Sequence, residues 1–213
     1  YKVSSDKVSG VNVNSSTLLK IDEARGSEVS SGLGYRYTFD DRVGGIDPSR
    51  GFQFRFGQDF TGLGGDINTV TTTALASYQI KAFREEVTFR AELEGGAVMA
   101  SKGDTRILDR FSGNGKIRGF EPNGLGPRDL TVANQDALGG NFFAVARLEA
   151  EFPLGLPEEY GITGGLFADV GSVWGLDNTL GGAIDDGAHL RSSVGVSIFW
   201  NTPIGPLRFN FSK

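Results

Sequence analysis

The stretch RILDRFSGNGKIRGFEPNGLGPRDL, residues 106–130, decides how the rest of the chain is interpreted. It contains five glycines and two prolines and lies between segments that alternate polar and apolar residues as strands do. A connection this long is uncommon in a compact sheet protein and is usually functional. It carries Arg110, Lys116, Arg118 and Arg128, whereas the next segment has acidic residues at alternate positions. We therefore expect a loop that folds back into a barrel and is held there by ion pairs.

The composition of the 213-residue chain narrows the classes of protein to which it can belong. No apolar run approaches the roughly 20 residues of a transmembrane helix, which excludes a helical membrane protein. The strands of a β-barrel remain possible, because alternation dilutes their hydropathy. The sequence has no cysteine, so disulfides and thiolate metal sites are excluded, and its net charge of −5 argues against binding to nucleic acid.

Alternation with a period of two recurs along the chain and predicts about nine strands. A short helix is expected at residues 17–26, after the possible N-cap residues 14–16. The connections alternate between short ones, residues 81–85 and 201–205, and long ones, residues 101–140 and 175–187. This pattern is typical of outer-membrane barrels. The expected strands are residues 2–9, 31–39, 52–60, 69–80, 87–93, 142–152, 162–174, 190–200 and 207–211.

The two faces of the expected strands differ in polarity, and this fits either a soluble sandwich or a membrane barrel. In a sandwich the apolar face would point inward; in a barrel it would meet lipid, and the polar face would line a lumen. Aromatic residues near strand ends favour the barrel, because such residues form girdles at membrane interfaces. These aromatics are Tyr35, Tyr37, Tyr78, Trp174 and Trp200. The lumen would be lined by Arg36, Arg55, Arg90, Glu92, Arg147, Glu149, Asp169 and Arg191.

Enzymatic chemistry finds little support in the sequence. The single histidine, His189, has no evident nucleophile and acid beside it, and a surface position is the better interpretation. One histidine without cysteine does not make a metal site, and the aspartates in the turns are explained by backbone hydrogen bonding. The glycine-rich residues 62–66 precede a Thr-rich strand rather than a helix, which argues against a phosphate loop. We expect no catalytic residue, metal or cofactor.

One constellation remains, formed by Arg118, Glu149 and Asp169. Both acids fall on the polar face of neighbouring strands, and the loop that carries Arg118 precedes them. A guanidinium can bind a carboxylate through two hydrogen bonds, which lysine cannot do. Two acids that face one lumen repel each other unless a cation lies between them. The alternative is that Arg118 is solvated and the acids line a wet pore.

At these residues the chain resembles a known family. The motif Ile117-Arg118-Gly119-Phe120, with residues 109–111 before it and 124–128 after it, resembles the signature loop of the BamA family of outer-membrane protein insertases. Further matches follow in the family's order and cover nearly the whole chain. They are residues 40–42, 48–51, 62–66, 137–140, 151–154, 167–174 and 200–208.

The resemblance implies that the chain forms about nine strands of a 16-stranded antiparallel transmembrane β-barrel, whose sixth extracellular loop enters the lumen. Arg118 would then anchor that loop, with Glu149, Phe167 and Asp169 as its partners on the two following strands. Gly119 would allow close approach of the backbone, and Phe120 would pack the loop tip. The implied function is the assembly and insertion of β-barrel proteins in the outer membrane of a Gram-negative bacterium. The implied partners are unfolded outer-membrane proteins, the lipoproteins of an assembly complex and the bilayer.

Against the family pattern, residues 1–213 are expected to be part of one barrel domain, with the inward loop at about residues 101–139. The periplasmic POTRA domains, about six earlier strands and the last strand are not in this sequence. Val43 also stands where many relatives have aspartate. Two other functions remain open, namely a TamA-like or two-partner secretion barrel that exports a substrate, and a passive porin or barrel enzyme.

Overall fold

The computed structural model describes residues 1–43, 49–84 and 86–213. Within these ranges the chain forms one α-helix, α1 (Thr17–Ala24), and one 3₁₀ helix, η1 (Glu158–Tyr160). No helix in the described ranges is both long enough and apolar enough to cross a membrane. The strands are β1 (Lys2–Lys7), β2 (Ser27–Asp40), β3 (Arg50–Thr61), β4 (Thr69–Ala82), β5 (Val87–Ala100), β6 (Phe142–Pro153), β7 (Ile162–Trp174), β8 (Arg191–Thr202) and β9 (Gly205–Ser212).

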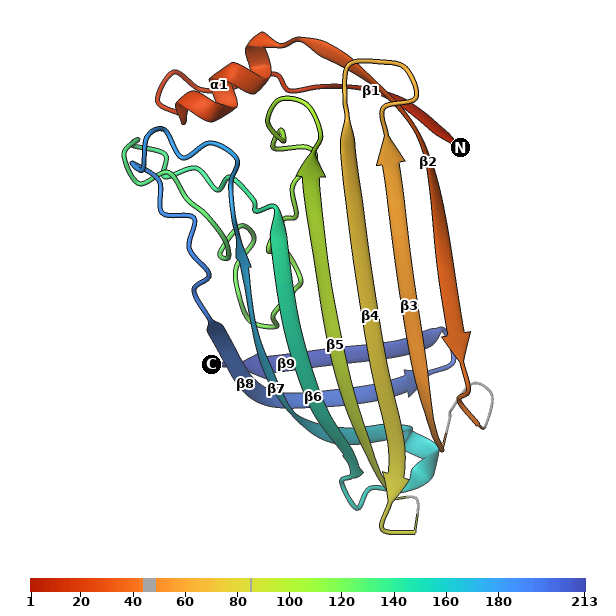
Figure 1. The fold of residues 1–213 in the computed structure, drawn as a ribbon. Helices are drawn as coiled ribbons and strands as arrows, with labels where there is room; N and C mark the ends of the chain where they lie inside the picture. The colour runs from red at the N-terminus through yellow and green to blue at the C-terminus, as the bar shows by residue number, and fades with distance from the viewer. Residues whose placement is uncertain (44–48, 85) are drawn as a thin grey trace.

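The strands form a single sheet in which each strand pairs with its neighbours in the sequence, in the order β1 to β9. Every pairing is antiparallel. The sheet curls strongly, so that β8 and β9 run across the view in which β2 to β6 run lengthwise (Figure 1). Sequential antiparallel pairing with a strong curl is the geometry of an up-and-down barrel wall.

The predicted all-β antiparallel fold is confirmed, and so is the short helix. Expected and observed strands differ mainly at their ends: β2 begins at Ser27 rather than at residue 31, and β5 continues to Ala100 rather than ending at residue 93. In both extensions polar and apolar residues alternate only weakly. The strand bounds there are therefore determined by pairing with neighbouring strands rather than by the sequence pattern. The helix η1 was not predicted. Asp47, Pro48 and Glu85, which belong to two predicted turns, lie outside the described residues.

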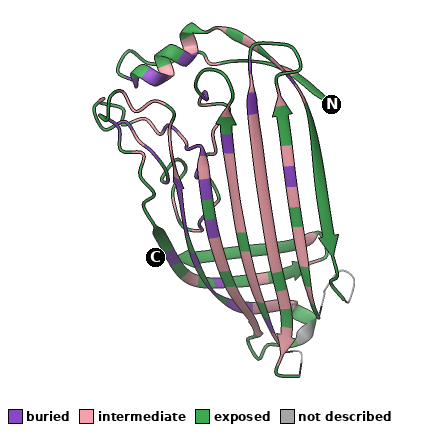
Figure 2. Cartoon of the chain, in the orientation of Figure 1, coloured by how far each residue is buried: buried purple, intermediate pink, exposed green. Residues whose placement is uncertain are grey.

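Burial separates the two interpretations of the alternating pattern. The apolar face of the sheet is exposed: Leu33, Tyr35 and Tyr37 on β2, for example, have exposed fractions of 51%, 53% and 55%. The buried positions lie mainly in the half of the sheet nearer the long connections (Figure 2). A soluble sandwich would bury this apolar face, whereas a membrane barrel turns it toward lipid. The structure therefore fits the barrel.

The connections differ between the two ends of the sheet. The long connections and α1 lie at one end, together with the shorter connection of residues 62–68, and η1 lies at the other end (Figure 1). Helix α1 begins where Ser16 caps it, because the side chain of Ser16 accepts a hydrogen bond from the backbone N–H of Leu18. Residues 101–141, between β5 and β6, turn back along the strands instead of extending away from them (Figure 1). This placement brings the loop against the polar face of the sheet.

Candidate functional site: an inward loop held by ion pairs

The side chain of Arg118 extends from the loop to the carboxylates of two neighbouring strands. Its Nε and Nη2 donate to the two carboxylate oxygens of Asp169 on β7, at 2.8 and 2.6 Å. Its Nη1 donates to Oε2 of Glu149 on β6, at 2.5 Å. The backbone N–H of Arg118 also donates to Asp169 Oδ2, at 3.0 Å. One guanidinium therefore binds one acid through two hydrogen bonds and a second acid through one.

An aromatic ring completes the contact. The guanidinium carbon of Arg118 lies 3.8 Å from the centre of the Phe167 ring, which is 4% exposed. Phe167 and Glu149 are directly paired across β6 and β7, so their side chains project to the same face. The Asp169 side chain is fully buried, and those of Glu149 and Arg118 are 8% and 16% exposed. Arg118 is thus enclosed by the three residues that the sequence predicts as its partners.

Glu149 holds more than one cation. It also accepts hydrogen bonds from Arg90 Nη1 on β5, at 3.2 Å, and from Arg208 Nη2 on β9. Sequence alternation places both arginines on the polar face but does not identify them as partners of Glu149. Arg90 is the register partner of Glu149 across β5 and β6, whereas Arg208 lies three strands away and approaches only because the sheet curls. One buried carboxylate therefore links the loop to two strands besides its own.

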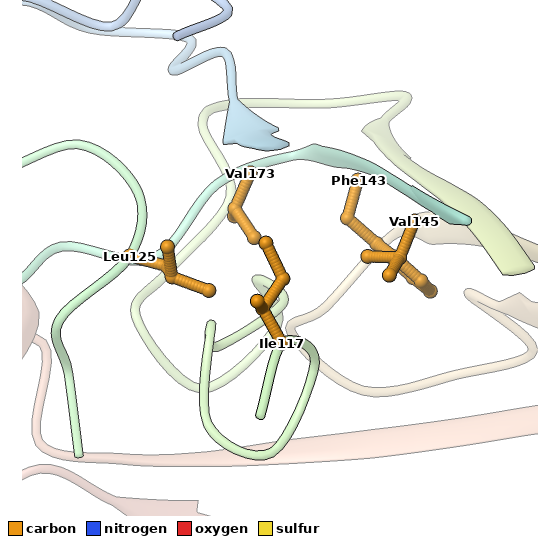
Figure 3. Close-up of a cluster of buried hydrophobic side chains, with 5 residues drawn as sticks. All are labelled: Ile117, Leu125, Phe143, Val145 and Val173. Carbon is orange, nitrogen blue, oxygen red and sulfur yellow. The ribbon is translucent and has the colours of Figure 1, made fainter. Parts of the chain in front are cut away.

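The loop also contributes apolar side chains to the interior. Ile117 is 1% exposed and packs in a cluster of buried residues with Leu125, Phe143, Val145 and Val173 (Figure 3). Phe143, Val145 and Val173 belong to the otherwise polar face of β6 and β7, which explains why the alternation is broken there. Burying such side chains contributes roughly 1.5–3 kcal/mol each. The loop is therefore held by hydrophobic contact as well as by charge.

The remaining two residues of the predicted motif follow Arg118. Phe120 is partly buried and packs against the Ile117 cluster. Gly119 has a φ of +84° and lies against Ser193 of β8 and Ser212 of β9, so close that a side chain would not fit. The structure thus brings all the predicted site residues to one place, and their functional role as a lock remains a prediction.

The outer part of the loop is joined to α1. Ser16 donates from its hydroxyl to Asp129, at 2.6 Å, and from its backbone N–H to Asp136, at 2.7 Å. Leu18 of α1, Leu138 of the loop and Ile184 of the β7–β8 connection form a second buried apolar cluster. The sequence does not indicate the contacts of Ser16, because they join segments more than 100 residues apart. Helix α1 and the two long loops therefore form one packed layer.

Asp129 makes this layer sensitive to pH. Burial would raise the pKa of its carboxyl, but hydrogen bonds from Ser16 and Thr131 outweigh burial and hold that pKa below its ordinary value. The carboxylate therefore stabilises the fold above its unfolded-state pKa of about 3.9, and this contribution is lost as the pH falls through the lower folded-state pKa.

Asp129→Asn is expected to loosen α1 at neutral pH, because an amide nitrogen would face groups that already donate hydrogen bonds. Hydrogen exchange of the α1 amides in the full-length protein should be faster in the variant than in the wild type at pH 7. The difference should shrink as the pH falls below about 4. Asp104→Asn, at an exposed carboxyl of the same loop, is the control. A difference that stayed constant from pH 7 to pH 3 would show that the charge of Asp129 is not responsible.

The described residues contain no group of three histidine, cysteine, aspartate or glutamate side chains placed to hold a metal ion. His189 lies at the surface, where its Nε2 is 2.9 Å from Asp185 Oδ2 and both side chains are exposed. No hydrogen bond or ion pair of the described residues joins this pair to Arg118.

Comparison with known proteins places this loop and sheet in a family. The family model described as the Omp85 superfamily domain matches residues 1–213. The chain belongs to the Omp85 superfamily. The resemblance inferred from residues 117–120 and the other motifs is therefore confirmed at the level of the family.

Relatives of this Omp85 chain include two proteins named outer membrane protein assembly factor BamA. The protein from Neorickettsia risticii (strain Illinois) is 32% identical over 214 residues, which cover 100% of this chain and 28% of the relative. The protein from Nitratidesulfovibrio vulgaris is 28% identical over 199 residues, covering 90% of this chain and 24% of the relative. The chain thus spans about a quarter of the length of these relatives.

A solved structure shares the fold of the Omp85 chain. The crystal structure of BamA from Haemophilus ducreyi lacking POTRA domains 1-3 superimposes with a TM-score of 0.75 and 20% sequence identity. The match covers 88% of this chain and 39% of that chain. Family, relatives and fold together indicate an integral β-barrel of the bacterial outer membrane.

Proposed function

We propose that this chain forms part of the wall of an outer-membrane protein assembly factor, with Arg118 as the lock of its inward loop. The proposal is carried by the match to a BamA relative that covers the whole of this chain at 32% identity. The ion-pair cluster around Arg118 supports it, because this cluster holds the loop against the polar face of the sheet. This chain would contribute part of the barrel wall and the Arg118 contact that holds the loop. The rest of the protein would contribute the strands at which substrates enter.

The substrates would be unfolded β-barrel proteins of the outer membrane, and the partners would include lipoproteins of an assembly complex and the bilayer itself. The physical basis would be strand pairing at a weak seam, where backbone groups of an incoming strand pair with an exposed sheet edge. No covalent chemistry is required for this activity. We therefore propose a protein that is not an enzyme and needs no cofactor.

Reconstitution of the full-length protein in liposomes tests this function. An unfolded barrel protein is added, and its folding is followed by the change in mobility on gels run with and without heating. We expect folding to be markedly faster than in liposomes that contain an unrelated porin of similar size.

Equal folding rates in the two kinds of liposome would contradict the proposal. Steady ion conductance without faster folding would indicate a passive porin. Movement of a secreted substrate into the liposome without insertion would indicate an export barrel of the TamA-like or two-partner secretion type. The three readouts are measured on one preparation, so they distinguish the three functions directly.

A further inference from the structure

A second arginine contacts the loop, and it projects from the wall rather than from the loop. Arg147 lies on β6, two residues before Glu149, and its side chain is 18% exposed. Its Nε and Nη2 both donate to the backbone carbonyl oxygen of Lys116, at 3.0 and 2.8 Å. Its Nη1 donates to Glu92, at 2.5 Å, and to Glu94, at 2.9 Å. All three nitrogens of this guanidinium therefore donate hydrogen bonds.

The side chain of Lys116 strengthens the same contact. Its Nζ donates to Glu94 Oε1 at 2.6 Å and lies 3.7 Å from the centre of the Phe143 ring. Glu94 thus lies between one cation of the loop, Lys116, and one of the wall, Arg147. At Lys116 the loop is therefore held both by the backbone carbonyl and by the side chain of this residue.

This arrangement flanks the buried Ile117 on its other side. Arg118 follows Ile117 and binds Glu149 and Asp169, whereas Lys116 precedes it and is bound by Arg147. We propose that Arg147 is a second positioning residue for the loop, which clamps the Lys116 carbonyl and is itself oriented by Glu92 and Glu94. The inference concerns how the loop is held and does not depend on the assembly function.

Arginine suits this position for a physical reason. Two nitrogens on one edge of its plane converge on one carbonyl oxygen, while the third turns toward the acids. Lysine has a single nitrogen and could not keep this geometry. Without Arg147, Glu92 would lose this ion pair and Glu94 would keep only its ion pair with Lys116 among those described here, so the repulsion between the two acids would grow. Because Arg147 binds a backbone oxygen, the identity of the Lys116 side chain matters less to the clamp than the position of its peptide.

Trypsin offers a direct test, because its cleavage sites after Lys116 and Arg118 lie within the docked segment. The full-length protein in liposomes is digested briefly, and cleavage at these two sites is measured by mass spectrometry relative to the exposed Lys102. Arg147→Met is expected to raise relative cleavage about tenfold, because proteolysis follows the population of the undocked loop. The temperature at which the barrel loses its compact form on gels should change little. A role in general stability would instead lower that temperature without selective cleavage in the loop.

Lys7→Met is the control, since it removes one positive charge from an exposed position of β1, five strands from β6 in the order of the sheet. Arg147→Lys provides the second test, because it keeps the positive charge beside Glu92 and Glu94 but has one nitrogen in place of three. It should also raise relative cleavage after Lys116 and Arg118. This variant decides the matter if Arg147→Met does not insert into the membrane, since it leaves no acid without a cation. Unchanged cleavage in Arg147→Met or in Arg147→Lys would overturn the proposal.

Discussion

Replacing Arg118 with glutamate is expected to release the loop and to weaken the barrel by about 3–5 kcal/mol, the usual effect of removing one partner from a buried ion pair. The substitution removes the cation shared by Glu149 and Asp169 and places a third acid beside them. In the full-length protein, the compact form seen on gels should be lost at a lower temperature. If the lock serves assembly, the folding of added barrel substrates should also slow.

Lys102→Glu is the control for this experiment, because it makes the same change of charge at an exposed position of the same loop. Asp169→Arg is the better rescue of Arg118→Glu, since an arginine at position 149 would face both Arg90 and Arg208. Recovery in the Arg118→Glu/Asp169→Arg pair would show direct contact. Wild-type behaviour of Arg118→Glu in both measurements would rule out the lock.

The sequence reveals the fold because the period of two survives in most strands and because loop lengths alternate. It also reveals the core of the site. Glu149 and Asp169 share a face by alternation, and the loop that precedes them carries an arginine that can bind both. The structure brings Arg118 to both acids and to Phe167, as the pattern and the family resemblance predict. Local periodicity is sufficient for Glu149 and Asp169 because they lie on adjacent strands, whereas Phe167 is predicted as a partner by the family resemblance.

The alternation of polar and apolar residues does not predict contacts that depend on strand register or on the curl of the sheet. Alternation places Arg147 and Arg208 on the polar face. It does not show that Arg147 binds the loop backbone or that Arg208 binds Glu149, because both contacts depend on the three-dimensional fold. The contact between Ser16 and Asp129 is of the same kind, since it joins a helix cap to a loop 113 residues away. Such pairs have no periodic signal, because loop conformation is decided by packing rather than by local preference.

Gly119→Ala is expected to destabilise the docked loop by roughly 2–4 kcal/mol, combining a strained backbone with overpacking. The φ of Gly119 is +84°, a region that alanine enters only with strain. An added Cβ would also lie 2.8 Å from Cβ of Ser212 and in contact with its hydroxyl. Rotation of Ser212 moves the hydroxyl but not its Cβ, so the backbone of either the loop or β9 must shift. Trypsin cleavage after Arg118 in the full-length protein should therefore increase strongly.

Gly115→Ala separates the two causes, because Gly115 has a φ of +70° in the same loop but no atom within 4 Å of an added Cβ. It should show only the backbone strain, about 1–2 kcal/mol. Adding Ser212→Gly to Gly119→Ala should reduce the effect to that of Gly115→Ala, since only the contact with β9 is relieved. Equal effects of Gly115→Ala and Gly119→Ala would mean that the loop tip does not press on β9. A larger effect of Gly119→Ala, as expected, would mean that the loop tip and β9 cannot move independently. Arg208 supports the same conclusion, because it joins β9 to Glu149, the carboxylate that holds Arg118.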